Sequence, residues 1–335
     1  MTVFSDPTFA ALGLLVLLAL GFDFLNGFHD AANSIATVIS TRVLRPYQAV
    51  AWAAFFNFLA LYVFAPKVAA TIGSGIINPA FVNDAVICGA LVGAIVWNLL
   101  TWYVGIPSSS SHALIGGLIG AGMAHSGTAA LMAPGIIKVA VFIVVSPVLG
   151  LLIGGLIMLG ISWACFRVAP IRLDRWFRRS QLVASALYSL GHGANDAQKT
   201  MGIIWLLLIS RNLTTRAHLP LWVMVSCYVA IAIGTLMGGW RIIKTMGQKL
   251  TPLTPASGSA ASAGGALTLF LASGYGIPVS TTHTIAGAIL GAGAVQNPSR
   301  TRWDVAASLV YAWVLTIPAA ALVAALVYRM ARSLF

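Results

Sequence analysis

Long apolar runs recur along the whole chain, and short polar segments separate them. A helix needs about 20 mainly apolar residues to cross the hydrocarbon core of a bilayer, and most of these runs reach that length. Because backbone polar groups in lipid must be satisfied internally, such runs form helices. The pattern predicts an all-α polytopic membrane protein, with roughly 10–12 helical segments in the membrane. The runs are Pro7–Gly27, Tyr47–Ala65, Ala85–Val104, Gly135–Phe166, Leu219–Trp240, Ser259–Tyr275 and Val305–Tyr328.

The composition agrees with this pattern. Hydrophobic residues make up 59% of the 335 residues and charged residues 8%, whereas about 25% charged residues are usual in a soluble domain. In a soluble protein the net charge of +12 would suggest nucleic-acid binding. Here Lys and Arg gather in short segments between the apolar runs, as membrane topology requires. We expect membrane lipid and no nucleic acid among the partners, and the sequence leaves homo-oligomerisation open.

The chain contains two copies of one unit. Gly105-Ile-Pro-Ser-Ser-Ser-Ser-His112, followed by a glycine-rich run, recurs as Gly276-Ile-Pro-Val-Ser-Thr-Thr-His283, followed by a similar run. A looser pair aligns Asn26-Gly-Phe-His-Asp30-Ala-Ala-Asn33 with Gly191-His-Gly-Ala-Asn195-Asp196-Ala-Gln198-Lys199, which places Asp30 opposite Asp196. Such self-similarity marks a duplicated fold. We predict a first transmembrane repeat over 1–166, a cytoplasmic basic linker over 167–181 and a second repeat over 182–335.

We expect each repeat to hold an interrupted helix (residues 8–40 and 182–210), a plain helix, a helical hairpin that turns at Gly-Ile-Pro, and a long last helix. If each hairpin enters and leaves on one side, a repeat crosses the membrane three times. The second repeat is then inverted relative to the first, and the polar motifs of both meet at a central site.

Basic residues set the expected orientation. Five Arg in the linker place it in the cytoplasm by the positive-inside rule, and both termini then lie outside. This orientation puts twelve basic residues on the cytoplasmic side: Arg42, Arg45, Arg167, Arg172, Arg175, Arg178, Arg179, Arg241, Lys244, Lys249, Arg300 and Arg302. It leaves six outside: Lys67, Lys138, Arg211, Arg216, Arg329 and Arg332.

Asp30 and Asp196 are the first candidates for chemistry. Each follows about 20 residues that lie in or near lipid, where an ionised carboxylate is costly and usually functional. The alternative, a local cap or pair at the membrane surface, is what we expect of Asp6, Asp84 and Asp304. The small polar clusters around the two motifs suggest that the helices unwind there and line a cavity. Lys199 is three residues from Asp196, so it either pairs with that carboxylate or contacts an anion.

The two Gly-Ile-Pro motifs supply the second part of a site. Pro107 and Pro278 stand where a helix can begin, and hydroxyl side chains follow beside free first-turn amides, which together suit an oxyanion. The alternative role of these hydroxyls is helix capping or interhelical packing. His112 and His283 either anchor the turn or carry protons. The hydroxyl residues are Ser109, Ser110, Ser111, Ser280, Thr281 and Thr282.

Charge balance connects the two kinds of motif. Carboxylates repel an oxyanion, so a site with both makes sense only if a cation enters too. This implies symport with a proton, sodium or a divalent metal; we expect no resident cofactor, and the sequence singles out no metal-ligand set. We expect the substrate to contact Asp30, Asn33, Asn195, Asp196, Gln198, Lys199 and the hydroxyl residues. The coupling ion is expected to involve Asp30, Asp196, His29, His192, His112, His283 and Asn57.

At these motifs, and at Gly239-Trp-Arg-Ile-Ile-Lys-Thr-Met-Gly-Gln-Lys-Leu-Thr-Pro-Leu-Thr-Pro255, the chain resembles the inorganic phosphate transporter (PiT) family over essentially its full length. It looks most like the bacterial, proton-coupled, low-affinity permease branch, which implies a bacterial inner membrane. The resemblance implies that Asp30 and Asp196 are essential, that Asn33 and Asn195 assist, and that the hydroxyl motifs bind phosphate. In the family pattern, sodium-coupled animal members carry intramembrane Glu near Asn57 and Ser262, which favours protons here.

Other functions fit less well. Sulfate, another tetrahedral oxyanion, stays an alternative substrate, and sodium an alternative coupling ion. An intramembrane hydrolase is disfavoured, because the sequence has no HExxH, no Glu and no GxSxG. A channel would not need two inverted halves around one polar site. We therefore predict a secondary transporter of phosphate rather than an enzyme.

Overall fold

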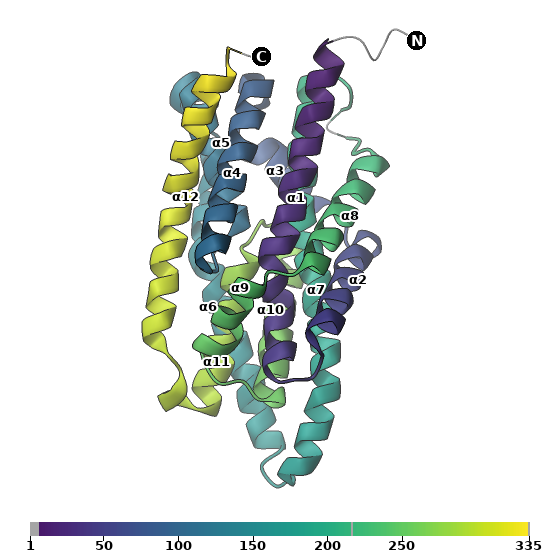
Figure 1. The fold of residues 1–335 in the computed structure, drawn as a ribbon, viewed down its shortest axis with the longest axis vertical. Helices are drawn as coiled ribbons and strands as arrows, with labels where there is room; N and C mark the ends of the chain where they lie inside the picture. The colour runs from purple at the N-terminus through teal and green to yellow at the C-terminus, as the bar shows by residue number, and fades with distance from the viewer. Residues whose placement is uncertain (1–6, 216, 334–335) are drawn as a thin grey trace.

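The computed structural model describes residues 7–215 and 217–333, so Asp6 and Arg216 lie outside the described residues. These ranges form twelve α-helices and no β-strand (Figure 1). The first six helices are α1 (Pro7–Ser40), α2 (Pro46–Val63), α3 (Lys67–Gly75), α4 (Asp84–Val104), α5 (Ser110–Ser126) and α6 (Ala133–Ala164). The second six are α7 (Pro170–Ser210), α8 (Leu221–Met237), α9 (Trp240–Lys244), α10 (Pro255–Gly274), α11 (Thr281–Gln296) and α12 (Trp303–Ala331).

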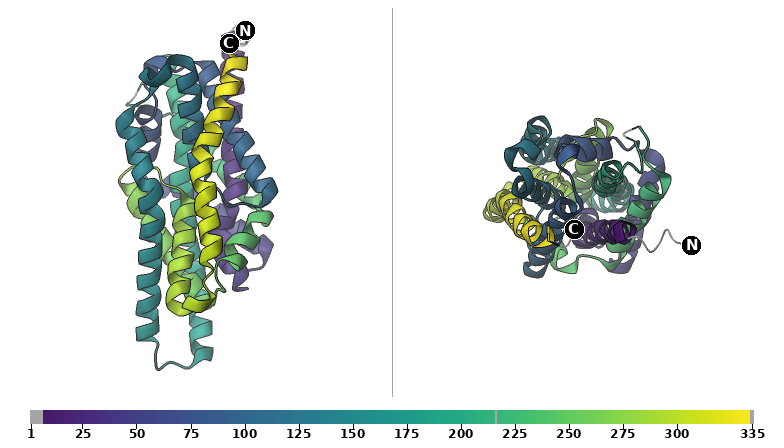
Figure 2. Two further views of the ribbon diagram at one scale, coloured as in Figure 1. Left: turned by 90° about the vertical axis from the view of Figure 1, so that its left-hand side faces the viewer. Right: turned by 90° about the horizontal axis from the view of Figure 1, so that it is seen from above.

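The two sets of six helices follow the same order of long and short elements. A long first helix is followed by a bent pair, a hairpin and a long last helix, in α1–α6 and again in α7–α12. Both termini lie at one end of the molecule, and the connection from α6 to α7 lies at the other (Figures 1 and 2). Helices α1 and α7 therefore run in opposite directions, as the inverted arrangement requires.

Helices α1 and α7 are unbroken, so the predicted unwinding at their polar motifs is wrong. The glycines in these motifs serve close helix packing instead. A Cβ on Gly27 would lie 2.2 Å from the Ile231 carbonyl oxygen of α8, and one on Gly193 would lie 2.4 Å from the Asn57 carbonyl oxygen of α2. Small residues let two membrane helices approach this closely.

The interruptions lie in the second element of each repeat. Helices α2 and α3 meet at an angle of 85°, and α8 meets the segment Trp240–Lys249 at 63°. Counting each bent pair as one span, up to six segments are long and apolar enough to cross a membrane; α1, α4, α6 and α12 qualify alone. Large aliphatic side chains on α6 and α12 are exposed, including Leu156 and Leu322, as expected for surfaces that face lipid tails.

Most of the basic segment 167–181 is helical, because α7 begins at Pro170. Proline suits the first turn of a helix, where its missing N–H costs nothing. Asp174 and Arg178 then lie one turn apart and form an ion pair of 2.7 Å, and Arg178 also donates to the Arg42 carbonyl oxygen at 3.1 Å. The basic end of α7 is thus joined to the end of α1.

The two Gly-Ile-Pro motifs form matching turns between α4 and α5 and between α10 and α11. Gly105 and Gly276 have φ values of +76° and +64°, a region that favours glycine. In each turn the following isoleucine N–H bonds back five residues, Ile106 to Thr101 at 2.9 Å and Ile277 to Ala272 at 2.8 Å, which is the Schellman helix ending. Helix α4 runs only from one end to the middle of the molecule (Figure 1), as a re-entrant hairpin would.

Each hairpin is covered by the last helix of the other half. Helix α12 packs against α4 and α5, while α6 packs against α10 and α11. The second half therefore supports the first hairpin and the first half supports the second, which brings both hairpin turns to the centre.

The orientation can be tested by cysteine labelling, with Cys88, Cys165 and Cys227 replaced. Asp174, near the start of α7, and Arg332, directly after α12, are both exposed. The start of α7 and the end of α12 lie at opposite ends of the molecule (Figure 1). A membrane-impermeant maleimide applied to intact cells should label Arg332→Cys but reach Asp174→Cys only after permeabilisation, because twelve basic residues favour the linker side and six the other. Labelling of both variants in intact cells would contradict the inverted arrangement.

Candidate substrate and cation site

Asp30 of α1 and Asp196 of α7 meet at the centre of the molecule. Both are buried, with 2% and 0% of their surface exposed. The hydroxyl of Thr281, at the start of α11, donates to Asp196 Oδ2 at 3.0 Å and also lies 3.5 Å from Asp30 Oδ2. One residue of the second hairpin thus joins the equivalent carboxylates of both halves.

Lys199 is buried beside this pair, with 1% of its surface exposed. Its ammonium donates to Asp196 Oδ1 at 2.5 Å, to Ser111 Oγ at 2.5 Å and to the Val279 carbonyl oxygen at 2.7 Å. An ammonium has three donors, and all three are used. The local pairing of Lys199 with Asp196 is confirmed, and Lys199 also links the two hairpin turns. Its direct contact with an anion stays a prediction.

The remaining residues of the first motif connect α1 to both hairpins. Asn33 donates to Thr282 Oγ1 at 2.8 Å. His29 Nδ1 lies 2.6 Å from Asp30 Oδ1, and its Nε2 lies 3.1 Å from Thr101 Oγ1 of α4. The carboxylate of Asp30 is thus tied to the first hairpin through His29.

Asn195 connects α7 to the second hairpin. Its amide donates to Ser273 Oγ at 3.1 Å and to the Ile277 carbonyl oxygen at 3.2 Å, and it accepts from the Val279 N–H at 3.1 Å. These bonds satisfy the backbone of the turn inside the apolar core, where unpaired groups are costly.

A group of side chains that could hold a cation lies at the same place. One ligand atom each from Asp30, His192 and Asp196 lie within 4.8 Å of one another, and all three side chains are buried. His192 Nε2 is 3.3 Å from Asp196 Oδ2, and its Nδ1 is 3.1 Å from Asn57 Oδ1. Oxygen ligands suit sodium, calcium and magnesium, whereas imidazole suits transition metals.

Ser109 and Ser280 cap the helices that follow the turns. Each hydroxyl oxygen accepts from a backbone N–H, that of His112 or His283, at 3.2 Å. A hydroxyl accepts through its oxygen and donates through its proton, so each cap can still donate to an anion. Ser110 Oγ is buried with no hydrogen-bond partner among the described residues, which leaves a free hydroxyl beside the first-turn amides of α5.

His112 and His283 lie against each other, with ring centroids 4.6 Å apart. The His283 ring also stacks on Trp313 of α12 at 3.8 Å, and Trp313 donates to the Pro107 carbonyl oxygen at 3.2 Å. The two histidines therefore join the two turns to each other and to α12.

Gln198 makes its hydrogen bonds with backbone groups and not with the carboxylates of Asp30 and Asp196. Its amide oxygen accepts from the Val68 N–H at 2.9 Å, and its amide nitrogen donates to the Ala65 carbonyl oxygen at 3.1 Å. These backbone groups lie at the bend between α2 and α3. Gln198 thus supplies partners that the interrupted helix has lost, and its contact with the substrate stays a prediction.

Sequence reasoning missed Thr101, Tyr188 and Trp313. Tyr188 donates to the Thr281 carbonyl oxygen at 3.0 Å, and Thr101 and Trp313 make the contacts given above. None of them lies in a repeated motif, and no spacing in the sequence relates them to the turns that they contact.

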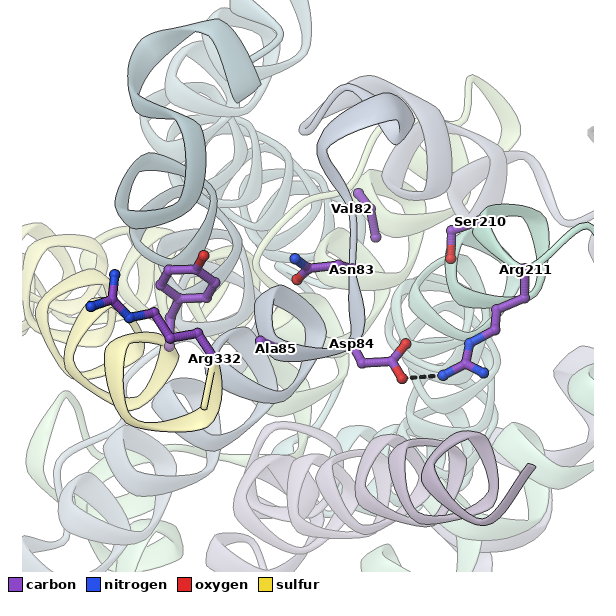
Figure 3. A pocket seen from close by; sticks show the side chains of 8 residues that line it. Val82, Asn83, Asp84, Ala85, Ser210, Arg211 and Arg332 are labelled. Carbon is purple, nitrogen blue, oxygen red and sulfur yellow. Dashed lines mark hydrogen bonds and ion pairs between the residues drawn. The ribbon is translucent and has the colours of Figure 1, made fainter. Parts of the chain in front are cut away.

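A cavity of about 460 Å³ lies apart from this site, between the start of α4 and the ends of α7 and α12 (Figure 3). There Arg211, at the end of α7, pairs with Asp84, the first residue of α4. Asp84 therefore pairs across the two halves rather than locally, whereas Asp304 pairs locally with Arg302 at 3.2 Å. The cavity contains none of the residues that the motifs pick out.

Comparison with known proteins identifies the family. A sequence model of the phosphate transporter family matches residues 26–324. This chain belongs to that family. The members it resembles are transporters and not enzymes, so the chain is an integral membrane transport protein.

Two relatives have the same description, "Probable low-affinity inorganic phosphate transporter". The one from Rhizobium meliloti (strain 1021) is 57% identical over 315 residues, which is 94% of each chain. The one from Bacillus subtilis (strain 168) is 44% identical over 326 residues, covering 96% of this chain and 97% of the relative. A solved structure titled "The sodium-dependent phosphate transporter" matches with a TM-score of 0.89 and 25% identity, over 97% of this chain and 100% of the other.

The position of Gln198 gives a test within this family fold. Gln198→Leu leaves backbone groups at the α2–α3 bend unpaired, at about 1–3 kcal/mol for each group, so its melting temperature in detergent should fall by at least about 3 °C. Gln248→Leu, on an exposed side chain, is the matched control and should change little. Loss of phosphate affinity at an unchanged melting temperature would instead make Gln198 a substrate ligand.

Proposed function

We propose that this protein is a symporter that imports inorganic phosphate together with a cation across a bacterial inner membrane. The observation that supports it most is the meeting of Asp30 and Asp196 through the Thr281 hydroxyl. The carboxylates come from the two halves, and the hydroxyl comes from a hairpin turn. A site shared between two repeats is what alternating access needs, because a movement of one half against the other changes which side the site faces.

Phosphate would bind between the two hairpin turns. Helices α5 and α11 both begin at this centre, and the N-terminus of a helix offers free N–H groups and partial positive charge to an anion. Ser109, Ser110 and Ser280 add hydroxyl donors. Lys199 adds a positive charge, and its three present bonds would have to rearrange for it to contact phosphate directly.

A cation is required because Asp30 and Asp196 would otherwise repel the anion. Protons are our first choice for this cation, or a divalent metal that travels with phosphate as a complex. Asn57 lies near a position where, in the family pattern, sodium-coupled members carry Glu. Here its neutral amide contacts His192. Sodium is the second candidate, since the matched solved structure is titled sodium-dependent.

The conformation described here is occluded. Asp30, Asp196, Lys199 and the hydroxyl residues of both turns are all buried, so phosphate cannot reach them from either end. Opening to one side would separate a hairpin from the opposite half. The contacts that would break first are those that cross the halves, such as Asn33 with Thr282 and Lys199 with Ser111.

Removing either carboxylate charge tests the coupling. Asp30→Asn and Asp196→Asn should reduce uptake of labelled phosphate into proteoliposomes to the level of empty liposomes, with both variants still present in the membrane, because each removes a charge that binds the cation. Uptake by the unmodified protein under separately imposed proton and sodium gradients identifies the ion. Full transport by either variant would refute this site.

The hydroxyl caps can be separated from phosphate ligands by comparing two substitutions at each position. As an N-cap, alanine costs about 1 kcal/mol relative to serine and glycine only a few tenths. A hydrogen bond to a charged group is worth about 1.5–3 kcal/mol, so losing it should raise the apparent Km for phosphate about 10- to 100-fold. If Ser109 and Ser280 donate to phosphate, Ala and Gly at either position should weaken affinity equally.

If the two serines are caps alone, the Gly variants should match the unmodified protein in both Km and stability, and only the Ala variants should be destabilised. The double variant Ser109→Ala with Ser280→Ala adds a second criterion. Loss of two ligands from one shared site should be non-additive, whereas purely additive losses would assign the turns to separate sites.

A further inference from the structure

Asp23 is a buried carboxyl group that the site described above does not use. It lies on α1, within the apolar span Phe9–Ser40, and 0% of its surface is exposed. Asp23 precedes Asp30 by two helical turns, about 10 Å along the helix axis. Helix α1 begins at the end that carries the termini, so Asp23 lies between that end and the central carboxylates.

The surroundings of Asp23 are polar but unpaired. Neither Asp23 oxygen accepts a hydrogen bond from any described residue. Asn26, one turn further along α1, and Thr200 of α7 are close enough to interact with the carboxyl group, but Asn26 Oδ1 and Thr200 Oγ1 also lack partners within the described ranges. Four buried oxygens from three residues therefore lie near one another, and none has a partner that meets hydrogen-bond geometry among the described residues.

Titratable groups on two other helices interact electrostatically with Asp23. Asp196 and Lys199 of α7 act on it electrostatically, as do Cys227 and Tyr228 of α8. Lys199 is committed to Asp196 and to the two turns, so it forms no ion pair with Asp23. Helix α4, which also packs against α1, has no charged residue after Asp84.

An ionised carboxylate in this position would carry a high free-energy cost. A charge inside the membrane is tolerated when it is paired or hydrated, and no described side chain pairs with Asp23. A protonated carboxyl carries no charge; it has one O–H donor and keeps acceptor capacity. The Asn26 amide oxygen can accept its proton, and the Thr200 hydroxyl can donate to its other oxygen. With a proton on Asp23, these buried oxygens can therefore form hydrogen bonds with one another.

We propose that Asp23, with Asn26 and Thr200, binds a transported proton at a site separate from Asp30 and Asp196. This proposal rests on the proposed symport. The proton reaches Asp23 from the end that carries the termini and neutralises a negative charge near Lys199 and Asp196, which favours phosphate at the centre. Release of the proton on the other side restores that charge and favours release of phosphate.

The test compares Asp23→Asn with a matched control, Asp304→Asn, which changes an exposed carboxylate. Each protein is reconstituted, and uptake of labelled phosphate is measured with and without an imposed pH gradient. In the unmodified protein and in Asp304→Asn the gradient should accelerate uptake. In Asp23→Asn the ratio of the two rates should fall to about one, whatever the absolute rate. A ratio equal to that of the unmodified protein would overturn the proposal.

A second measurement detects the proton without transport. Infrared difference spectra between two pH values should contain the carbonyl band of a protonated carboxyl group in the unmodified protein and in Asp304→Asn. This band should be lost in Asp23→Asn and should titrate at a different pH in Thr200→Val. Its persistence in Asp23→Asn would refute the assignment even if that variant transports nothing.

Two outcomes distinguish a failure of the proton site at Asp23 from a failure of the proposed symport. If the infrared band depends on Asp23 but no gradient drives uptake by the unmodified protein, the proton site stands and the symport fails. If a sodium gradient alone drives uptake and Asp23→Asn abolishes the response to sodium, Asp23 binds sodium, which overturns the proton assignment while symport stands.

Discussion

The burial of two carboxylates at one point inside an apolar protein is the constraint on which the rest of the structure depends. Asp30 and Asp196 are both inaccessible to solvent, and a buried charge is tolerated only when it is paired and hydrogen-bonded. Lys199, His29 and the Thr281 hydroxyl supply that compensation. They come from α7, α1 and α11, so the site forms only when both halves are in place.

This compensation also explains why the motif helices are continuous. A helix that unwound at Asp30 or Asp196 would add unpaired backbone groups to a centre that already carries two charges. The bends occur instead in the second element of each repeat, and at the first of them a side chain from the opposite half supplies the missing partners. At the α2–α3 bend, Gln198 of α7 pairs with the Val68 N–H and the Ala65 carbonyl oxygen.

The exchange of last helices ties the two hairpins to the opposite halves. Because α12 covers the first hairpin and α6 the second, a hairpin cannot move without changing its packing against the other half. Trp313 illustrates this link, since it donates to Pro107 of one turn and stacks on His283 of the other. A shift of α12 would therefore change the contacts of both turns. We regard this packing as the physical basis for coupling phosphate binding to a change of access.

Membrane character and the hairpin turns were predictable from the sequence, because each rests on local chemistry. Apolar runs must be helical in lipid. Gly105 and Gly276 adopt the left-handed conformation that glycine permits, each followed by a proline and a serine cap. The pairing of Lys199 with Asp196 follows from their spacing on one helix.

Only the tertiary structure decided which residues meet. Gln198 lies at a bend, and Gly27 and Gly193 lie in close helix contacts, because of residues more than 100 positions away in the chain. Asp23 lies beside Thr200 of α7 for the same reason. A sequence shows that a polar residue lies in an apolar helix. It cannot show whether that residue faces a backbone group, another charge or an unpaired oxygen, because the packing of both halves determines those neighbours.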